Sequence, residues 1–295
     1  MDRIEIGKTQ ELTILRMTEI GAYVGYADTD PDFAILLPKK QLPENAKNGD
    51  KITAFTYKDS EDRPIATVNR PYAEVGEFAY LQIKSAVKIG AFADWGLEKD
   101  LFVPFKEQEE LLAPGDTVLL YVYLDKSGRL AATTRVYDHL TTEGSGEYRE
   151  NDSFSGVVYR NEKTIGSFVA VAPRGEAITL NQSYKKMHFG LIPAPQVFQK
   201  YKIGTVVDGR IVRVRKDGKL DVDSRLRDFE QLDTDGERIL KKIAEYGGEL
   251  PFSDKASPEI IKRELQMSKN GFKKALGHLY KAHKVEIREN SVKLL

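Results

Sequence analysis

The spacing of apolar residues along the chain changes near residue 235. Before that point apolar residues come in short runs typical of strands. Val118–Leu124, for example, is rich in β-branched and aromatic residues. Ile211–Arg215 alternates apolar and polar positions, and Asp217-Gly218 separates it from a second alternating run, Lys219–Asp223. An Asp-Gly pair between two such runs indicates a β-hairpin. The pattern predicts a mainly β chain that ends in a small helical region.

A short motif occurs three times in the β-rich part. The copies are Ile20-Gly21-Ala22-Tyr23-Val24, Ile89-Gly90-Ala91-Phe92-Ala93 and Ile165-Gly166-Ser167-Phe168-Val169. Each is followed by an apolar run ending in proline (Pro38, Pro104, Pro193) and then by a glycine that opens another β-rich run (Gly49, Gly115, Gly204). The spacing between copies places an insertion near residues 170–189 of the third copy. About five short strands per copy favour small closed barrels of the OB type.

The tail has the pattern of a winged helix-turn-helix. Residues 235–246 carry one apolar helical face, with Thr234 or Asp235 as the expected N-cap. Ser257-Pro258 and Ser268 are expected to begin two further helices. Residues 285–288 and 291–294 are expected to form a hairpin. We therefore predict barrels at residues 1–70, 71–140 and 141–227, a winged-helix domain at 228–295, and a polar interdomain linker at 141–152.

Charge is unevenly distributed although the chain is neutral overall, with 45 basic and 45 acidic residues. Residues 1–140 have a net charge of −6, residues 141–227 of +5 and residues 228–295 of +1. This asymmetry suggests that a polyanion meets the rear half, although solvated charged faces would give the same pattern. The chain has no cysteine, which excludes disulfides and thiolate metal sites, and no secretion signal or membrane-spanning segment is apparent. We expect a cytoplasmic protein without membrane association.

The second copy of the motif resembles the S1 RNA-binding domain. The resemblance lies in Lys88–Gly96, Leu101-Phe102-Val103-Pro104 and Pro114-Gly115-Asp116. In the S1 family, the aromatic after Gly-Ala and the residue second before the proline stack on bases, which here are Phe92 and Phe102. The first and third copies have Leu36 and Leu191 at the second of these positions. Three such repeats followed by a winged helix resemble the conserved virulence factor B family of bacterial RNA-binding proteins.

An aromatic side chain on an exposed barrel strand can stack on a base of any sequence, and neighbouring cations can hold phosphates. The second copy offers Phe92, Trp95 and Phe102 with Lys88 and Arg129, and the third offers Phe168, His188 and Phe189 with Lys185, Lys186, Lys219 and Arg225. The alternative is that Tyr23, Phe92 and Phe168 belong to barrel cores, that Trp95 closes a barrel end, and that His188 is an ordinary loop histidine. The first copy is rich in aspartate near its aromatics, which favours a spacer or a protein-contact role.

The last predicted helix carries lysines away from its apolar stripe: Lys269, Lys273, Lys274 and Lys281. Such a face could contact the phosphates of structured RNA or duplex DNA, or it could simply be solvated. Asp221 and Asp223 share a strand face and could hold a cation, but Arg215, Arg225 and Arg227 make an ion-pair network the favoured interpretation.

No phosphate-binding loop, zinc helix or nucleophile elbow is present, so we expect neither a cofactor nor enzymatic activity. The favoured function is binding of single-stranded RNA in post-transcriptional control, including control of virulence factors, with contacts to the ribosome or RNA machinery possible. The alternatives are a winged-helix DNA-binding transcriptional regulator and a nuclease that holds its substrate with S1 modules. In the favoured case, changing Phe168, Lys273 and Lys274 to alanine should weaken RNA binding more than changing Tyr23.

Overall fold

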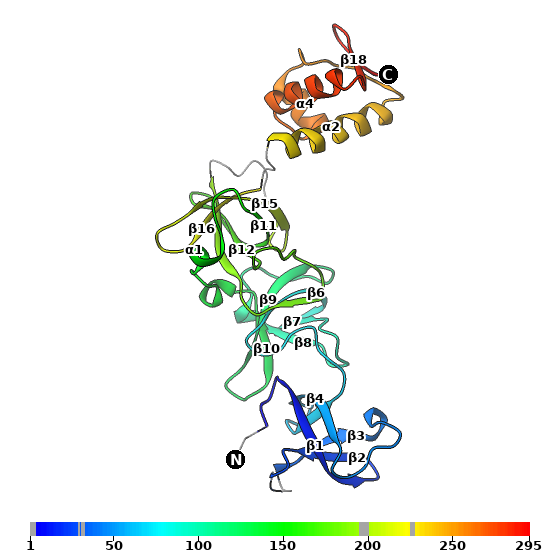
Figure 1. The fold of residues 1–295 in the computed structure, drawn as a ribbon, viewed down its shortest axis with the longest axis vertical. Coiled ribbons are helices and arrows are strands. Elements are labelled where there is room, and N and C mark those ends of the chain that lie inside the picture. Colours follow the sequence, from blue (N-terminus) through cyan, green and yellow to red (C-terminus); the bar gives the residue numbers. More distant parts are fainter. Residues whose placement is uncertain (1–3, 29, 31–32, 195–200, 225–227) are drawn as a thin grey trace. The chain divides into compact units, whose positions relative to one another are not determined.

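The computed structural model describes residues 4–28, 30, 33–194, 201–224 and 228–295. It divides into one unit of residues 1–224 and a second of residues 225–295 (Figure 1). The first unit contains three five-stranded barrels and the second a small helical domain with a three-stranded sheet. The mainly β fold expected from the sequence is confirmed.

The first barrel is closed, with strand order β1-β2-β3-β5-β4. Its elements are β1 (Thr9–Thr18), β2 (Gly21–Gly25), β3 (Ile35–Pro38), the 3-10 helix η2 (Lys39–Gln41), β4 (Lys51–Lys58) and β5 (Pro64–Thr67). Leu12, Ile14, Val24 and Leu37 are among the buried side chains of its core.

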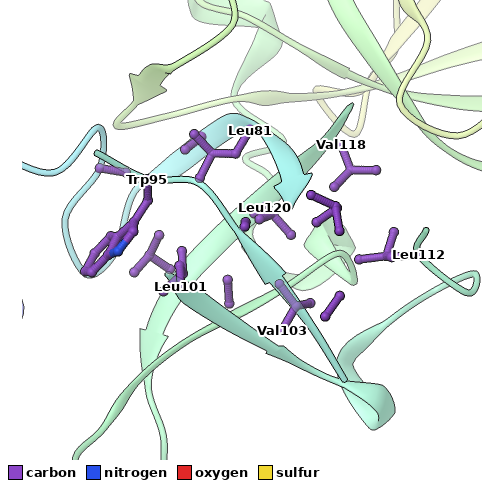
Figure 2. Close-up of a cluster of buried hydrophobic side chains, with 14 of the residues drawn as sticks. Leu81, Trp95, Leu101, Val103, Leu112, Val118 and Leu120 are labelled. Carbon is purple, nitrogen blue, oxygen red and sulfur yellow. The ribbon is translucent and has the colours of Figure 1, made fainter. Parts of the chain in front are cut away.

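The second barrel follows the order β10-β9-β6-β7-β8, and β8 packs beside β10. Its elements are β6 (Phe78–Val87), β7 (Gly90–Ala93), β8 (Leu101–Pro104), η3 (Phe105–Glu107), β9 (Thr117–Leu124), β10 (Leu130–Thr133) and η4 (Val136–His139). Figure 2 shows its core, in which Leu81 of β6, Leu101 and Val103 of β8, and Val118 and Leu120 of β9 converge. Inward residues alternate with outward ones along each strand, so these strands present a second, outer face.

The third barrel is closed in the order β11-β12-β14-β16-β15. Its elements are α1 (Gly144–Glu147), β11 (Ser153–Glu162), β12 (Gly166–Val171), β14 (His188–Pro193), β15 (Val206–Val214) and β16 (Leu220–Asp223). The hairpin expected around Asp217-Gly218 is confirmed as β15 and β16. The insertion contains one more strand, β13 (Gln182–Tyr184), which pairs with β6 of the second barrel.

The segment 141–152 is not the linker that its polar sequence indicated. The Gly144 amide donates to the Gly218 carbonyl at 3.0 Å, and the Thr141 amide donates to the Met187 carbonyl at 2.9 Å. Tyr148 is buried in the core of the third barrel, where its hydroxyl donates to the Ala172 carbonyl at 2.6 Å. The prediction was wrong because these backbone hydrogen bonds and one buried aromatic side chain anchor an otherwise polar segment to the barrel.

The C-terminal unit has the expected winged-helix elements. They are α2 (Asp228–Glu245), β17 (Glu249–Leu250), α3 (Pro258–Leu265), α4 (Lys269–Lys281), β18 (Val285–Ile287) and β19 (Val292–Leu294). The caps predicted at Ser257 and Ser268 are confirmed, since their hydroxyls accept from the amides of Ile260 and Gly271. The cap predicted at Thr234 or Asp235 is wrong, because both residues lie inside α2, where Gly236 faces Leu279 of α4.

The repeated glycine has the same steric role in each barrel. Gly21, Gly90 and Gly166 open the second strand, and each is paired with the proline that ends the third. A Cβ atom on these glycines would lie 2.1, 2.3 and 2.0 Å from the carbonyl oxygens of Leu37, Val103 and Ile192. The contact is with backbone, so a change of side-chain rotamer cannot relieve it. The motif is therefore glycine because two strands cross too closely for any side chain.

Replacing Gly90 by alanine should destabilise the second barrel by about 3 kcal/mol or more, because the new methyl group meets a backbone carbonyl. The readout is urea unfolding followed by the fluorescence of Trp95, the chain's single tryptophan, which lies in that core. Gly115→Ala is the control: its φ of +90° is also unfavourable for alanine, but nothing lies within 4 Å. The control should lose only about 1–2 kcal/mol, and equal losses would contradict the steric explanation.

Candidate nucleic-acid interface

The motif aromatics point away from the core of their own barrel. Tyr23, Phe92 and Phe168 occupy the same position on β2, β7 and β12. Their neighbours along the strand are the ones that face the core: Ala22 and Val24, Ala91 and Ala93, and Val169. Each aromatic therefore belongs to the outer face of its barrel, where a ligand or a neighbouring domain can cover it.

The first strand determines what lies beside each aromatic. In each barrel this strand has a β-bulge just before the residue that pairs with the aromatic. That residue is Arg16 in the first barrel, Ser85 in the second and Arg160 in the third. The Arg16 guanidinium carbon lies 4.7 Å from the centre of the Tyr23 ring, and that of Arg160 lies 5.6 Å from the Phe168 ring. In the second barrel the residue paired with Phe92 is the small Ser85, which brings no guanidinium to the ring.

The third strand supplies a second ring only in the second barrel. Phe92 pairs with Phe102, whereas Tyr23 pairs with Leu36 and Phe168 with Leu191. The centres of the Phe92 and Phe102 rings are 5.2 Å apart with their planes at 38°. Both side chains are half-buried. Two adjacent, partly exposed rings form an apolar surface that can receive flat aromatic ligands.

Phe168 and Phe189 do not offer such a surface. They are only 8% and 5% exposed, and they pack in one cluster with Phe78 and Leu119 of the second barrel. In this structure the second barrel covers their outer face, so neither ring is accessible to stack on a base as expected.

His188 is also buried, with 0% of its surface exposed. Its Nε2 lies 2.7 Å from Oε2 of Glu147, and its ring packs edge-on against Tyr148. Burial lowers the pKa of His188, and the Glu147 carboxylate only partly opposes that shift. The expected base contact is wrong, because this histidine holds α1 against the barrel instead.

Trp95 is 2% exposed and lies in the core of the second barrel (Figure 2). Its Nε1 donates to the Lys99 carbonyl at 2.6 Å, and its ring packs edge-on against Phe55 of the first barrel at 5.7 Å. A base-stacking role for Trp95 is contradicted, and the alternative, that it closes a barrel end, fits this position.

Several of the predicted phosphate-binding cations have partners within the protein. Both carboxylate oxygens of Asp62 in the first barrel bind the Arg129 guanidinium. Lys186 lies 3.4 Å from Glu143 and 3.5 Å from Glu147. Arg129 is thus a contact between barrels, which the sequence did not indicate.

The other predicted cations of the barrels differ in their surroundings. The Lys219 ammonium lies 4.4 Å from the centre of the Phe189 ring. Lys88 and Lys185 are exposed. Arg225 lies outside the described residues. Asp221 and Asp223 form ion pairs, as predicted, with Arg213 and Arg210. Of the expected partners, Arg215 pairs with Asp217, and Arg227 lies outside the described residues, as Arg225 does.

The lysines of α4 lie on its outer face. Phe272, Ala275, Leu276 and Leu279 are buried, whereas Lys273, Lys274 and Lys281 are exposed and Lys269 is half-buried. Lys273 lies 3.8 Å from Asp254. This arrangement gives the helix a basic outer surface over an apolar inner one.

Comparison with known proteins agrees with this architecture. Residues 237–294 match the CvfB-like winged helix domain, and residues 6–69 and 75–135 match the S1 domain. The conserved virulence factor B of Staphylococcus epidermidis is 30% identical over 83% of this chain and 80% of its own length. The chain belongs to the conserved virulence factor B family.

Another relative is the uncharacterized protein YitL of Bacillus subtilis, which is 28% identical over 96% of this chain and 92% of its own length. A crystal structure of a multidomain protein with nucleic acid binding domains from Streptococcus pneumoniae covers 98% of both chains at 24% identity, with a TM-score of 0.48. S1 and winged-helix domains are nucleic-acid-binding types, so membership of the family indicates nucleic-acid binding. Within the described ranges, no helix has the length and apolar character needed to cross a bilayer.

The buried His188 predicts a pH dependence of stability. Its pKa in the folded chain is lower than the ordinary value of 6.5, so protons bind more readily to the unfolded chain below that pH. Stability should therefore be full above about pH 6.5 and fall as the pH drops toward the folded pKa. The measurement is the urea midpoint by circular dichroism between about pH 7.5 and about pH 5.5.

As the pH falls through this range, the urea midpoint of the His188→Asn variant should decrease less than that of the unaltered chain. Burial also lowers the pKa of His139, so that residue should leave some dependence in the variant. A variant with an unchanged pH dependence would show that His188 does not contribute.

Proposed function

We propose that this chain binds single-stranded RNA in the cytoplasm and acts in post-transcriptional control of gene expression, including that of virulence factors. The observation that carries the proposal is the pair of outward rings, Phe92 and Phe102, on the second barrel. Stacking contributes roughly 1–3 kcal/mol per base and needs unstacked bases, which single strands provide.

In this proposal the part of the chain from residue 141 onward attracts the RNA phosphates. The segment 141–227 has a net charge of +5, whereas residues 1–140, which include the ring pair, have −6. Exposed Lys185 in the third barrel and the α4 lysines are the proposed phosphate contacts. Most of the charge would then come from a different part of the chain than the stacking. Near the rings, the exposed cations close in sequence include Lys99, three residues before Phe102, and Lys88, four residues before Phe92.

Phe92→Ala and Phe102→Ala should each weaken binding of a labelled single-stranded RNA, by roughly 1–3 kcal/mol for a lost stacked base. Fluorescence anisotropy measures this for RNA and for a single-stranded DNA of matching sequence. Phe33→Ala is the control, because Phe33 is 74% exposed in the acidic first barrel. If all three substitutions weaken RNA binding equally, or if none does, the ring pair is not part of the binding site.

The double substitution Lys273→Ala and Lys274→Ala should make the slope of log affinity against log salt concentration shallower, by the amount that corresponds to about two lost phosphate contacts. The affinity for different RNA sequences should fall by similar factors, because phosphate contacts carry no base preference. Tyr23→Ala should leave the salt dependence unchanged. An unaltered salt dependence in the lysine variant would mean that the α4 face is only solvated.

The second candidate function is transcriptional regulation through duplex DNA. It is favoured by the basic outer face of α4, the helix that enters the major groove in winged-helix proteins. Duplex DNA in the same anisotropy series distinguishes the two. Tighter binding to duplex DNA than to single-stranded RNA, insensitive to Phe92→Ala, would favour the DNA-binding function.

A further inference from the structure

We propose that the second and third barrels act as one undivided body, in which the outer face of β11 and β12 is a docking surface for the second barrel that stays closed while nucleic acid is bound. This is the face that carries the motif aromatic. The third barrel would then meet a ligand only through its other surfaces. The docking itself is independent of the proposed function, and only its persistence in the bound state rests on RNA binding.

The burial of β12 distinguishes it from its counterparts. Every residue of β12 is buried, whereas β2 and β7 leave Tyr23 and Phe92 half-exposed. The outward residues Phe168, Ala170 and Ala172 join Val157 and Tyr159 of β11 in a cluster with Phe78, Leu119 and Val136 of the second barrel. A strand that is apolar on both faces needs a partner on each, and here the second partner is a barrel.

Backbone hydrogen bonding reinforces this packing. β13, the strand of the insertion, pairs antiparallel with β6, and Ser183 stands opposite Ala79. The Asn181 amide donates to the Tyr80 carbonyl at 2.9 Å, and the Tyr80 hydroxyl donates to the Gly204 carbonyl at 2.8 Å. The insertion of the third barrel thus adds a strand to the sheet of the second barrel, and this restricts rotation between the two barrels.

At the edge of the contact between the second and third barrels, the two backbones approach closely and charged side chains form ion pairs. A Cβ atom on Gly204 would lie 1.9 Å from the Thr117 carbonyl oxygen, so the two backbones approach as closely as glycine allows. Lys202 lies 2.6 Å from Asp116, and Arg160 lies 3.3 Å from Glu109. The second barrel uses β6, β9 and η4 here, which leaves Phe92 on β7 and Phe102 on β8 outside the contact.

Urea unfolding followed by Trp95 fluorescence tests the docking without any ligand. Phe168→Ala, although it alters the third barrel, should move the Trp95 transition to clearly lower urea, because it removes packing against the second barrel. Phe92→Ala, at the equivalent position of the second barrel itself, should move it little. A Trp95 transition that Phe168→Ala leaves in place would overturn the proposal. If the Phe168→Ala variant does not fold, the Trp95 transitions of the milder variants Phe168→Leu and Phe92→Leu are compared instead, with the same expected difference.

A reversible cross-link tests whether the face stays closed. Ala79→Cys with Ser183→Cys places one possible disulfide across the β6–β13 pair in a chain that otherwise has no cysteine. The oxidised and reduced forms should bind single-stranded RNA with dissociation constants within about two-fold. Binding that is lost on oxidation and restored by a reductant would show that the face must open. If the unaltered chain binds no RNA, the proposed function fails while the urea experiment still decides the docking.

Discussion

The close backbone crossing at the start of each second strand is the constraint on which the rest of the molecule depends. Because Gly21, Gly90 and Gly166 each pair with a proline, the register between second and third strands is the same in all three barrels. That register puts the motif aromatic on the outer face, opposite the residue second before the proline. The barrels differ in what lies at that place. Side chains of the neighbouring strands surround Tyr23 and Phe92, whereas Phe168 is also covered by the second barrel.

The sequence was informative wherever a property belongs to a single barrel or helix. Apolar alternation, the repeated Gly–Pro spacing and the serine caps depend on residues close in sequence, so three barrels and a winged helix could be predicted from them. The outward direction of Phe92, and its partner Phe102, also follow from spacing together with the S1 resemblance.

Prediction failed where one barrel covers another. Phe168 and Phe92 occupy the same motif position, and only the presence of the second barrel's outer face makes one buried and the other accessible. A signal was present in the sequence, since residues 168–172 are apolar at every position, whereas Asp94 interrupts the corresponding residues 92–96 of the second barrel. Ion pairs were equally out of reach: the partner of Arg129 is 67 residues away, in the hairpin of another barrel.

The insertion between β12 and β14 also determines how the chain can be divided. A fragment that begins at residue 141 would carry the apolar outer face of β11 and β12 into water without its cover, and β13 would present unpaired backbone groups along one edge. Exposed surfaces of this kind promote self-association. In a deletion series, a loss of solubility would then be mistaken for a loss of binding. The shortest fragment in which the third barrel keeps its folded surroundings is one that also includes the second barrel.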